Sequence, residues 1–103
     1  ANAADQEYQA GLDVFIVSMG DKAREKAFEL AHSMRRTGLA VDFDMIGRGL
    51  KAQMRYADKM RARFVAIIGD DELAAEEATV KDMSTGEQTR IAQAELATCV
   101  RRQ

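Results

Sequence analysis

Apolar and polar residues alternate in blocks along this chain, and each block has the length and period of a strand or a helix. Residues 14–17 form an uninterrupted apolar run, which is typical of a strand covered on both faces. Residues 21–37 place apolar side chains three and four positions apart, which predicts an amphipathic helix. Cations in its last turn and Gly38 just beyond are typical of a helix end.

The next segments repeat the order of strand, helix and strand. Residues 39–43 predict a second strand, and residues 50–61 predict a second helix whose inward side begins with Leu50. The third strand, residues 64–68, is apolar without alternation, so we expect it at the centre of the sheet. Because crossovers between parallel strands are right-handed, these segments predict a parallel βαβαβ core.

The pattern changes after the third strand. Residues 70–75 can form a short helical turn. Residues 77–82 and 88–91 alternate between apolar and polar positions on either side of a Ser-Thr-Gly turn, so they predict a hairpin at an edge of the sheet. Residues 93–102 predict a last amphipathic helix.

Together these segments predict an α/β fold of three layers. Its mixed five-stranded sheet combines the parallel βαβαβ core with the edge hairpin, and three main helices cover it. The 103 residues suffice for one domain, which we place at residues 12–103. Residues 1–11 are small and polar, so we expect a linker there.

Charge and cysteine content narrow the possible partners. The formal net charge of -2 gives no general attraction to polyanions, so any contact with nucleic acid must use a local basic patch. No apolar run is long enough to span a bilayer. Cys99 is the only cysteine, which excludes an internal disulfide and fits a reducing compartment. We therefore expect a cytoplasmic protein.

Residues for catalysis are scarce. His32 is the only histidine, and a surface position within a helix is its simplest interpretation. Cys99 has no histidine near it in sequence, so we expect a buried, inert thiol. The acidic residues 70–77 lack the glycine of a calcium loop, and a solvated rim suits them better than a cation site. We predict neither catalytic residues nor metal ligands.

The glycine-flanked Arg48 is the most informative local feature. It opens the second helix, where backbone N–H groups could face an anion, but it matches neither the dinucleotide fingerprint nor the P-loop. Its placement favours a binding role, since ligands gather beyond the carboxyl ends of parallel strands. Residues 18–20, 44–48 and 69–72 are such ends and should converge on one rim. With Asp44, Arg48 and Glu72, that rim is suited to the edges of nucleobases.

Cations cluster on the second helix and recur in the hairpin. Lys51, Arg55 and Lys59 follow its polar side, either as solvated surface or as a strip for a phosphate backbone. Lys81 lies in a strand predicted at an exposed edge. It could protect that edge from aggregation or contact a ligand, and the residues alone leave both interpretations open.

Four segments resemble a known family. They are DVFIV from Asp13 with Gly20 beyond it, GRGLKAQMRYADK at 47–59, ARF leading to IIGDDEL at 62–73, and VKDM with TGEQ at 80–88. They resemble the C-terminal anticodon-binding domain of class IIa aminoacyl-tRNA synthetases, and most closely that of the histidyl-tRNA synthetases. The resemblance covers nearly the whole chain after residue 12. Gly49 and Arg55 depart from the usual pattern only modestly.

The resemblance implies an anticodon-binding-domain-like fold and a role. The domain would hold the anticodon stem-loop of histidine tRNA while a separate catalytic domain, joined through residues 1–11, aminoacylates the tRNA with ATP and Mg²⁺. The parent enzyme would be a homodimer, and the isolated domain would bind tRNA and catalyse nothing. Contacts with bases or sugars are expected from Asp44, Arg48 and Glu72. Contacts with the RNA backbone, or electrostatic steering, are expected from Lys51, Arg55 and Lys81.

Two other functions fit the same pattern. The fold could serve as a dimerisation or regulatory appendage of a synthetase-like protein, or as a flavodoxin-like binder of a small molecule or nucleotide. Arg48 and Asp58 could also have purely structural roles at the helix. We expect Tyr56 and Ala57 to face partly inward and to be structural.

Overall fold

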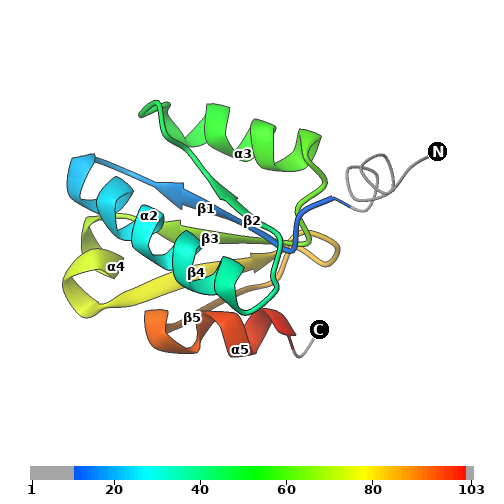
Figure 1. Ribbon diagram of the computed structural model, residues 1–103. Coiled ribbons are helices and arrows are strands. Elements are labelled where there is room, and N and C mark those ends of the chain that lie inside the picture. The colour runs from blue at the N-terminus through cyan, green and yellow to red at the C-terminus, as the bar shows by residue number, and fades with distance from the viewer. Residues whose placement is uncertain (1–10, 102–103) are drawn as a thin grey trace.

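The computed structural model describes residues 11–101. Figure 1 shows how its helices are arranged around one sheet. In chain order the elements are β1 (Val14–Ser18), α2 (Asp21–Arg36), β2 (Val41–Phe43), α3 (Leu50–Lys59), β3 (Phe64–Ile68), α4 (Asp70–Ala75), β4 (Glu77–Asp82), β5 (Gln88–Ala92), the 3-10 helix η1 (Gln93–Glu95) and α5 (Leu96–Arg101).

The five strands form one mixed sheet in the order β2-β1-β3-β4-β5. β1 pairs in parallel with β2 and with β3, so that Val14 lies opposite Val41 on one side and Phe64 on the other. β4 is antiparallel to both β3 and β5. The predicted mixed five-stranded sheet is confirmed, and β3 is its central strand.

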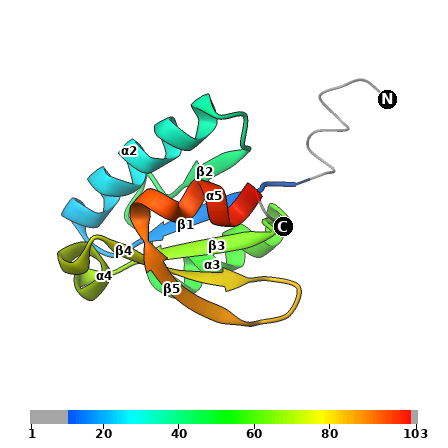
Figure 2. The ribbon, with the colours of Figure 1, turned by 90° about the horizontal axis from the view of Figure 1, so that it is seen from below.

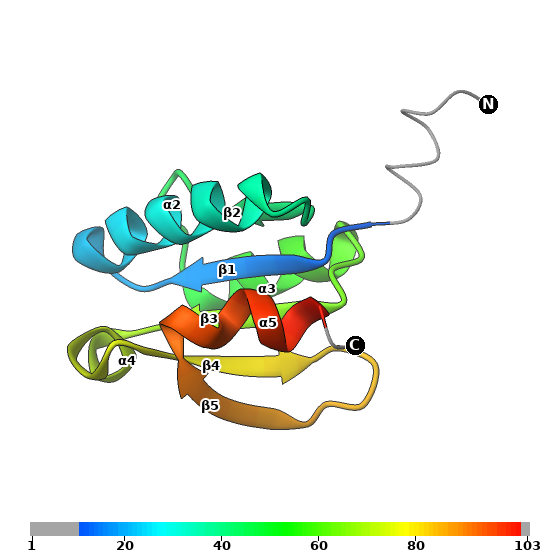
Figure 3. The same cartoon turned by 60° about the horizontal axis from the view of Figure 1, so that its bottom comes forward.

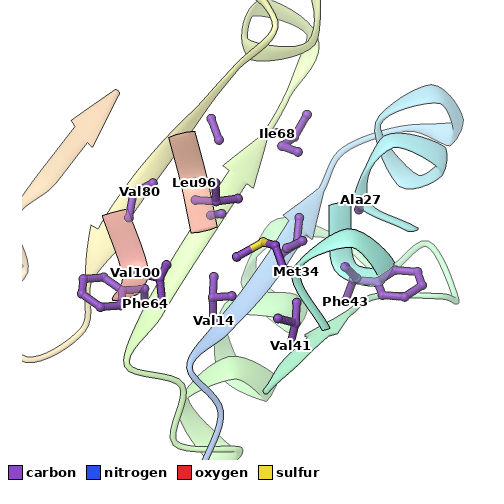
Figure 4. Close-up of a cluster of buried hydrophobic side chains, with 14 of the residues drawn as sticks. Val14, Ala27, Met34, Val41, Phe43, Phe64, Ile68, Val80, Leu96 and Val100 are labelled. Atoms are coloured by element: carbon purple, nitrogen blue, oxygen red, sulfur yellow. The ribbon is translucent and has the colours of Figure 1, made fainter. Parts of the chain in front are cut away.

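Helices cover both faces of this sheet and make three layers, as predicted. Side chains of α2 and α5 join one core cluster with Val14, Ile16 and other residues of the same sheet face; Figure 4 shows this cluster. α3 packs on the opposite face, where Phe15, Val17 and Ala57 form a second cluster. Figure 3 shows α2 and α5 in front of the sheet and α3 behind β1 and β3.

The close approach of α2 to the sheet follows from its sequence. Ala23, Ala27 and Ala31 are buried at helical spacing, and small side chains allow the helix axis to lie near the strands. The helix ends at Arg36, and Gly38 beyond it adopts φ +95°, a left-handed conformation that glycine tolerates best.

The prediction that Lys81 lies in an exposed edge strand is wrong. Lys81 belongs to β4, whose residues pair with Val65 of β3 and with Gln88 of β5. A hairpin added to a sheet places only its outer strand at the edge, and the two edges here are β2 and β5. Protection of an edge therefore does not explain Lys81.

Smaller differences concern α3 and the last helix. α3 ends at Lys59, two residues earlier than predicted, and Leu50 is 44% exposed instead of facing the core. Cys99 is half-buried, not buried. The final helix opens with a 3-10 turn, and its predicted last residue, like the predicted linker apart from Gly11, lies outside the described residues.

One part of the sheet carries no helix. In the views of Figures 2 and 3, α3 lies over β1 and β3 and leaves the same face of β4 and β5 uncovered within the described part of the chain. The register places four polar side chains there, and we call them the open half-face: Thr79, Lys81, Gln88 and Arg90. No helix of the described residues is both long and apolar enough to cross a membrane.

Candidate nucleic-acid interface

The side chain of Asp44 holds the loop between β2 and α3 through hydrogen bonds to residues of the same loop. Its carboxylate is fully buried; Oδ2 accepts the backbone N–H groups of Gly47 (2.7 Å) and Arg48 (2.8 Å). Oδ1 accepts Nε–H of Arg48 at 2.9 Å, which completes an ion pair. Gly47 has φ +92°, so the tight turn depends on glycine. The result is a loop whose shape is fixed from inside by one carboxylate.

Arg48 is held from a second side by an aromatic ring. Its guanidinium carbon lies 4.9 Å from the centroid of the Tyr56 ring, a cation–π arrangement. The Tyr56 ring in turn packs against Phe15 of β1, with 5.6 Å between the ring centroids. The side chain of Arg48 thus lies on the face of the sheet that α3 covers, and Tyr56 has the structural role that was predicted.

Gln53 supports the rim from within, and it was not assigned to the site from the sequence. It is fully buried within α3, and its Oε1 accepts the N–H of Ser18 at 3.0 Å. Its Nε2 donates to the carbonyl oxygens of Ser18 (2.8 Å) and Arg48 (2.5 Å). Gln53 therefore joins the end of β1 to the 44–49 loop. The available signal was a polar residue on the inward side of an amphipathic helix.

Glu72 performs a similar task at the end of β3. Its Oε1 accepts the N–H of Gly69 at 3.0 Å, and its Oε2 accepts the hydroxyl of Thr79 at 2.8 Å. A further bond, from the N–H of Met19 to the carbonyl of Ile68 (3.1 Å), connects the ends of β1 and β3. The prediction that the three strand ends lie along one rim is confirmed.

Both rim carboxylates are ionised at lower pH than usual. Burial by itself raises the pKa of Asp44, but the hydrogen bonds and charge of Arg48 and the N–H of Gly47 outweigh it and leave the pKa below its ordinary value. Burial also raises the pKa of Glu72, and the bonds from Thr79 and the backbone again lower it overall. With their oxygens bonded inside the protein, the predicted contacts of these two carboxylates with RNA stay predictions.

The predicted cations lie on one face of the molecule. Arg48 stacks on the α3 side, and Lys51 and Arg55 are exposed on α3 itself. Lys81 is half-buried on the open half-face, directly opposite Val65 of the second core cluster. The structure therefore brings four cations from three segments to the same side of the sheet, although their contacts with RNA stay predictions.

The open half-face contains further residues that were not singled out. Arg90 lies opposite Thr79, and its Nε donates to Glu77 at 2.6 Å while Nη2 donates to the carbonyl of Asp71 at 3.2 Å. Gln88 lies opposite Lys81 and is exposed. The two-residue period of the hairpin could have revealed both, once its register with β4 was known.

The other side of the molecule has a different chemistry. A groove of about 690 Å³ runs along α2 and the edge strand β2, beside Phe28, whose ring packs edge-on against Phe43. Three carboxylates and one arginine line it, together with Met45 of the loop after β2: Asp21, Glu25, Glu29 and Arg24. Asp21 is paired with Arg24, and Glu29 with Lys26. Carboxylates repel a phosphate backbone, so this groove is the less suitable side for nucleic acid.

His32 is exposed, as predicted, and its ring packs against Phe28. Among residues 11–101, no group of three or more His, Cys, Asp or Glu side chains could hold a metal ion.

A comparison with protein families identifies the family to which the fold belongs. The family model described as "Anticodon binding domain" matches residues 13–103. The chain belongs to this family. The resemblance read from the four sequence segments is thereby confirmed at the level of the domain.

Histidine–tRNA ligases are among the most similar relatives of this anticodon-binding domain. The histidine–tRNA ligase of Geobacillus kaustophilus is 47% identical over 97 residues, which are 94% of this chain and 23% of that protein. The apo histidyl-tRNA synthetase of S. aureus superposes with a TM-score of 0.83 and 40% identity, over 87% of this chain and 26% of that one. The chain thus spans about a quarter of the length of these relatives.

A more distant neighbour supports the fold alone. The RNA-binding domain of threonyl-tRNA synthetase from Cryptosporidium parvum superposes with a TM-score of 0.77 at 18% identity, over 86% of this chain and 22% of that one. The three-layer architecture therefore persists where the sequence similarity is low.

Proposed function

We propose that this chain is the anticodon-binding domain of a histidine–tRNA ligase and that it holds the anticodon stem-loop of histidine tRNA. The observation that carries the proposal is the gathering of Arg48, Lys51, Arg55 and Lys81 on the α3 side of an anticodon-binding fold. The ligase relatives, which match 94% of the chain at 47% identity, support histidine tRNA as the partner.

The charge distribution supports this surface. With a formal net charge of -2, the chain does not attract RNA as a whole, so a local cluster of cations has to do so. The α3 side supplies that cluster, while the groove along α2 is lined by three carboxylates. An RNA loop would therefore approach over α3 and the open half-face, where Lys51 and Arg55 meet its phosphates.

We assign each residue of the surface a role according to whether its side chain is already hydrogen-bonded within the protein. Arg48 and Lys81 contact the anticodon loop directly, and Lys51 and Arg55 steer or bind its backbone. Asp44 and Glu72 hold the rim in shape, because their oxygens are already bonded to the loop after β2 and to the ends of β3 and β4. This assigns them to positioning where the sequence suggested direct contacts.

In a whole ligase the domain would work beside a catalytic part. That part would use ATP and Mg²⁺ to attach histidine to the tRNA, as the resemblance implies, and the enzyme would act as a homodimer in the cytoplasm. The single cysteine fits a reducing compartment. Within the domain, the residues proposed above bind and orient the RNA and take no part in the chemistry.

Mapping the bound RNA by NMR tests the proposed surface. The ¹⁵N-labelled chain is titrated with the anticodon stem-loop of histidine tRNA, and the same stem closed by an unrelated loop serves as control. We expect the largest amide shifts in residues 44–55 and on the open half-face, and smaller ones with the control. Shifts concentrated in α2 would contradict the proposed surface.

A further inference from the structure

Arg48 is fixed more completely than a surface arginine needs to be. Its Nε donates to Asp44 Oδ1 at 2.9 Å, its guanidinium carbon lies over the Tyr56 ring, and its carbonyl oxygen accepts a hydrogen bond from Gln53. Its backbone N–H is held by the same Asp44 carboxylate. Backbone and side chain are therefore both immobilised, and the partners that hold them lie inside the protein.

The outer edge of the guanidinium remains available. Within residues 11–101, Nη1 and Nη2 have no hydrogen-bond partner, and the side chain keeps 36% of its surface exposed, against 0% for Asp44. The two Nη groups point donors in fixed, nearly parallel directions. Such a fork matches an acceptor that presents two oxygens or nitrogens side by side.

Two groups of an RNA loop present such a pair of acceptors: a phosphate, and the Hoogsteen edge of guanine with O6 and N7. The surroundings of Arg48 favour guanine. Its positive charge is already paired with the buried carboxylate of Asp44, 2.9 Å from Nε, which weakens the attraction for a second anion. The ion pair with Asp44 leaves the geometry of the two Nη donors unchanged, so they can still bond a base. The same ion pair cancels much of the positive charge that would attract a phosphate.

The residues beside Arg48 favour a base for a second reason. Ile46, in the same loop, is 74% exposed and is the most exposed large apolar side chain of the described chain, whereas Met45 lines the groove along α2. Ile46 offers apolar surface to the flat face of an unstacked base and nothing to a phosphate. Lys51, three residues after Arg48, is a better candidate for the backbone.

We propose that Arg48 reads one guanine of the anticodon loop, with Nη1 and Nη2 donating to its O6 and N7. Asp44, Tyr56 and Gln53 hold the fork in place, and Ile46 packs against the base. This inference rests on the proposed function, since it names the group that is recognised at the same surface.

Atomic replacement in the RNA tests the assignment. Anticodon stem-loops of histidine tRNA are synthesised with each loop guanine replaced in turn by 7-deazaguanine, which removes the N7 acceptor only. Binding to the 103-residue chain is measured for wild type, Arg48→Ala and Arg48→Lys, and Arg36→Ala serves as a control arginine exposed at the end of α2. Arg48→Lys keeps a cation next to Asp44 but cannot form the fork.

The expected pattern is specific to one position. Loss of N7 at that guanine weakens binding to wild type and to Arg36→Ala about threefold to tenfold, which corresponds to one hydrogen bond of a bidentate pair. Arg48→Ala and Arg48→Lys bind more weakly and lose nothing further from the same replacement. Thermal unfolding shows which variants are folded. If Arg48→Ala is unfolded, wild type is compared with Arg48→Lys alone.

Two results would overturn the assignment. Wild type could be insensitive to 7-deazaguanine at every position, or Arg48→Lys could lose as much from the replacement as wild type does. If wild type instead binds the histidine stem-loop no better than one with an unrelated anticodon, the proposed function itself fails. With that selectivity present and no coupling to N7, only the guanine assignment fails.

Discussion

The side-chain amide of Gln53 forms both backbone hydrogen bonds that Ser18 lacks from a neighbouring strand. β2 ends at Phe43, which pairs with Ile16, so β1 continues past the end of β2. The amide takes the place of the missing strand with an acceptor at 3.0 Å and a donor at 2.8 Å. Because Gln53 also bonds Arg48, the end of the sheet and the candidate interface share one buried residue.

Gln53→Leu should destabilise the domain by about 2–4 kcal/mol, because it leaves two buried backbone groups of Ser18 and the partly buried carbonyl of Arg48 without this partner. The measurement is the free energy of unfolding in urea. Gln88→Ala, at an exposed glutamine, should change it by less than about 0.5 kcal/mol. A Gln53→Leu protein as stable as wild type would show that the amide does not support the rim.

Asp44→Asn should cost about 2 kcal/mol of stability at neutral pH, because the amide cannot accept from Arg48 and two backbone N–H groups as a carboxylate does. The pKa of Asp44 is lowered in the folded state, so its contribution is complete above the ordinary value of 3.8 and is lost as the pH falls through the lower folded value. The gap in unfolding free energy between wild type and variant should therefore close in acid. A gap that widens there would contradict this account.

Gly47→Ala should lower stability by about 1–2 kcal/mol, since Gly47 has φ +92° in the loop that Asp44 holds. Gly49, two residues on, has φ -70° and space for a methyl group, so Gly49→Ala should cost less than about 1 kcal/mol. Thermal unfolding of the two variants compares the same substitution at the residues before and after Arg48. Equal losses would show that the loop conformation does not depend on Gly47.

Lys51→Ala should reduce the salt dependence of RNA binding, because one phosphate contact contributes a slope of about 0.7 to 1 in log K against log salt concentration. Lys22→Ala, an exposed lysine on α2, should leave the slope unchanged. Titrations with the histidine anticodon stem-loop over a range of salt concentrations provide the slopes. Identical slopes for wild type and Lys51→Ala would remove Lys51 from the backbone contacts.

The sequence predicted the order and type of every main element. Strands and helices that are buried in the three layers carry apolar side chains at a fixed period. Residues 14–17 and 21–37 could therefore be assigned to a strand and a helix from their pattern alone. The strand that contains Lys81 was misplaced because alternation shows a half-exposed strand without showing which neighbours it has. β4 alternates because the helices leave one of its faces open.

The site was predicted in outline and not in its internal bonds. Strand ends located the rim, and motif resemblance located Arg48. Sequence could not show that Asp44 and Glu72 would bond within the rim, because hydrogen-bond partners depend on loop conformation. Leu50 was assigned to the core because it is hydrophobic, but it is exposed. Gln53 is buried in its place, and its amide bonds the backbone of Ser18.

Anticodon selectivity is the most direct test of the central claim that this domain holds the anticodon of histidine tRNA. The dissociation constant of the chain is measured at one fixed salt concentration for histidine tRNA and for a transcript that differs only in its anticodon. We predict that the substituted transcript binds at least about tenfold more weakly, since a few base contacts of about 1–3 kcal/mol each are lost. Equal dissociation constants for the two transcripts would contradict the claim.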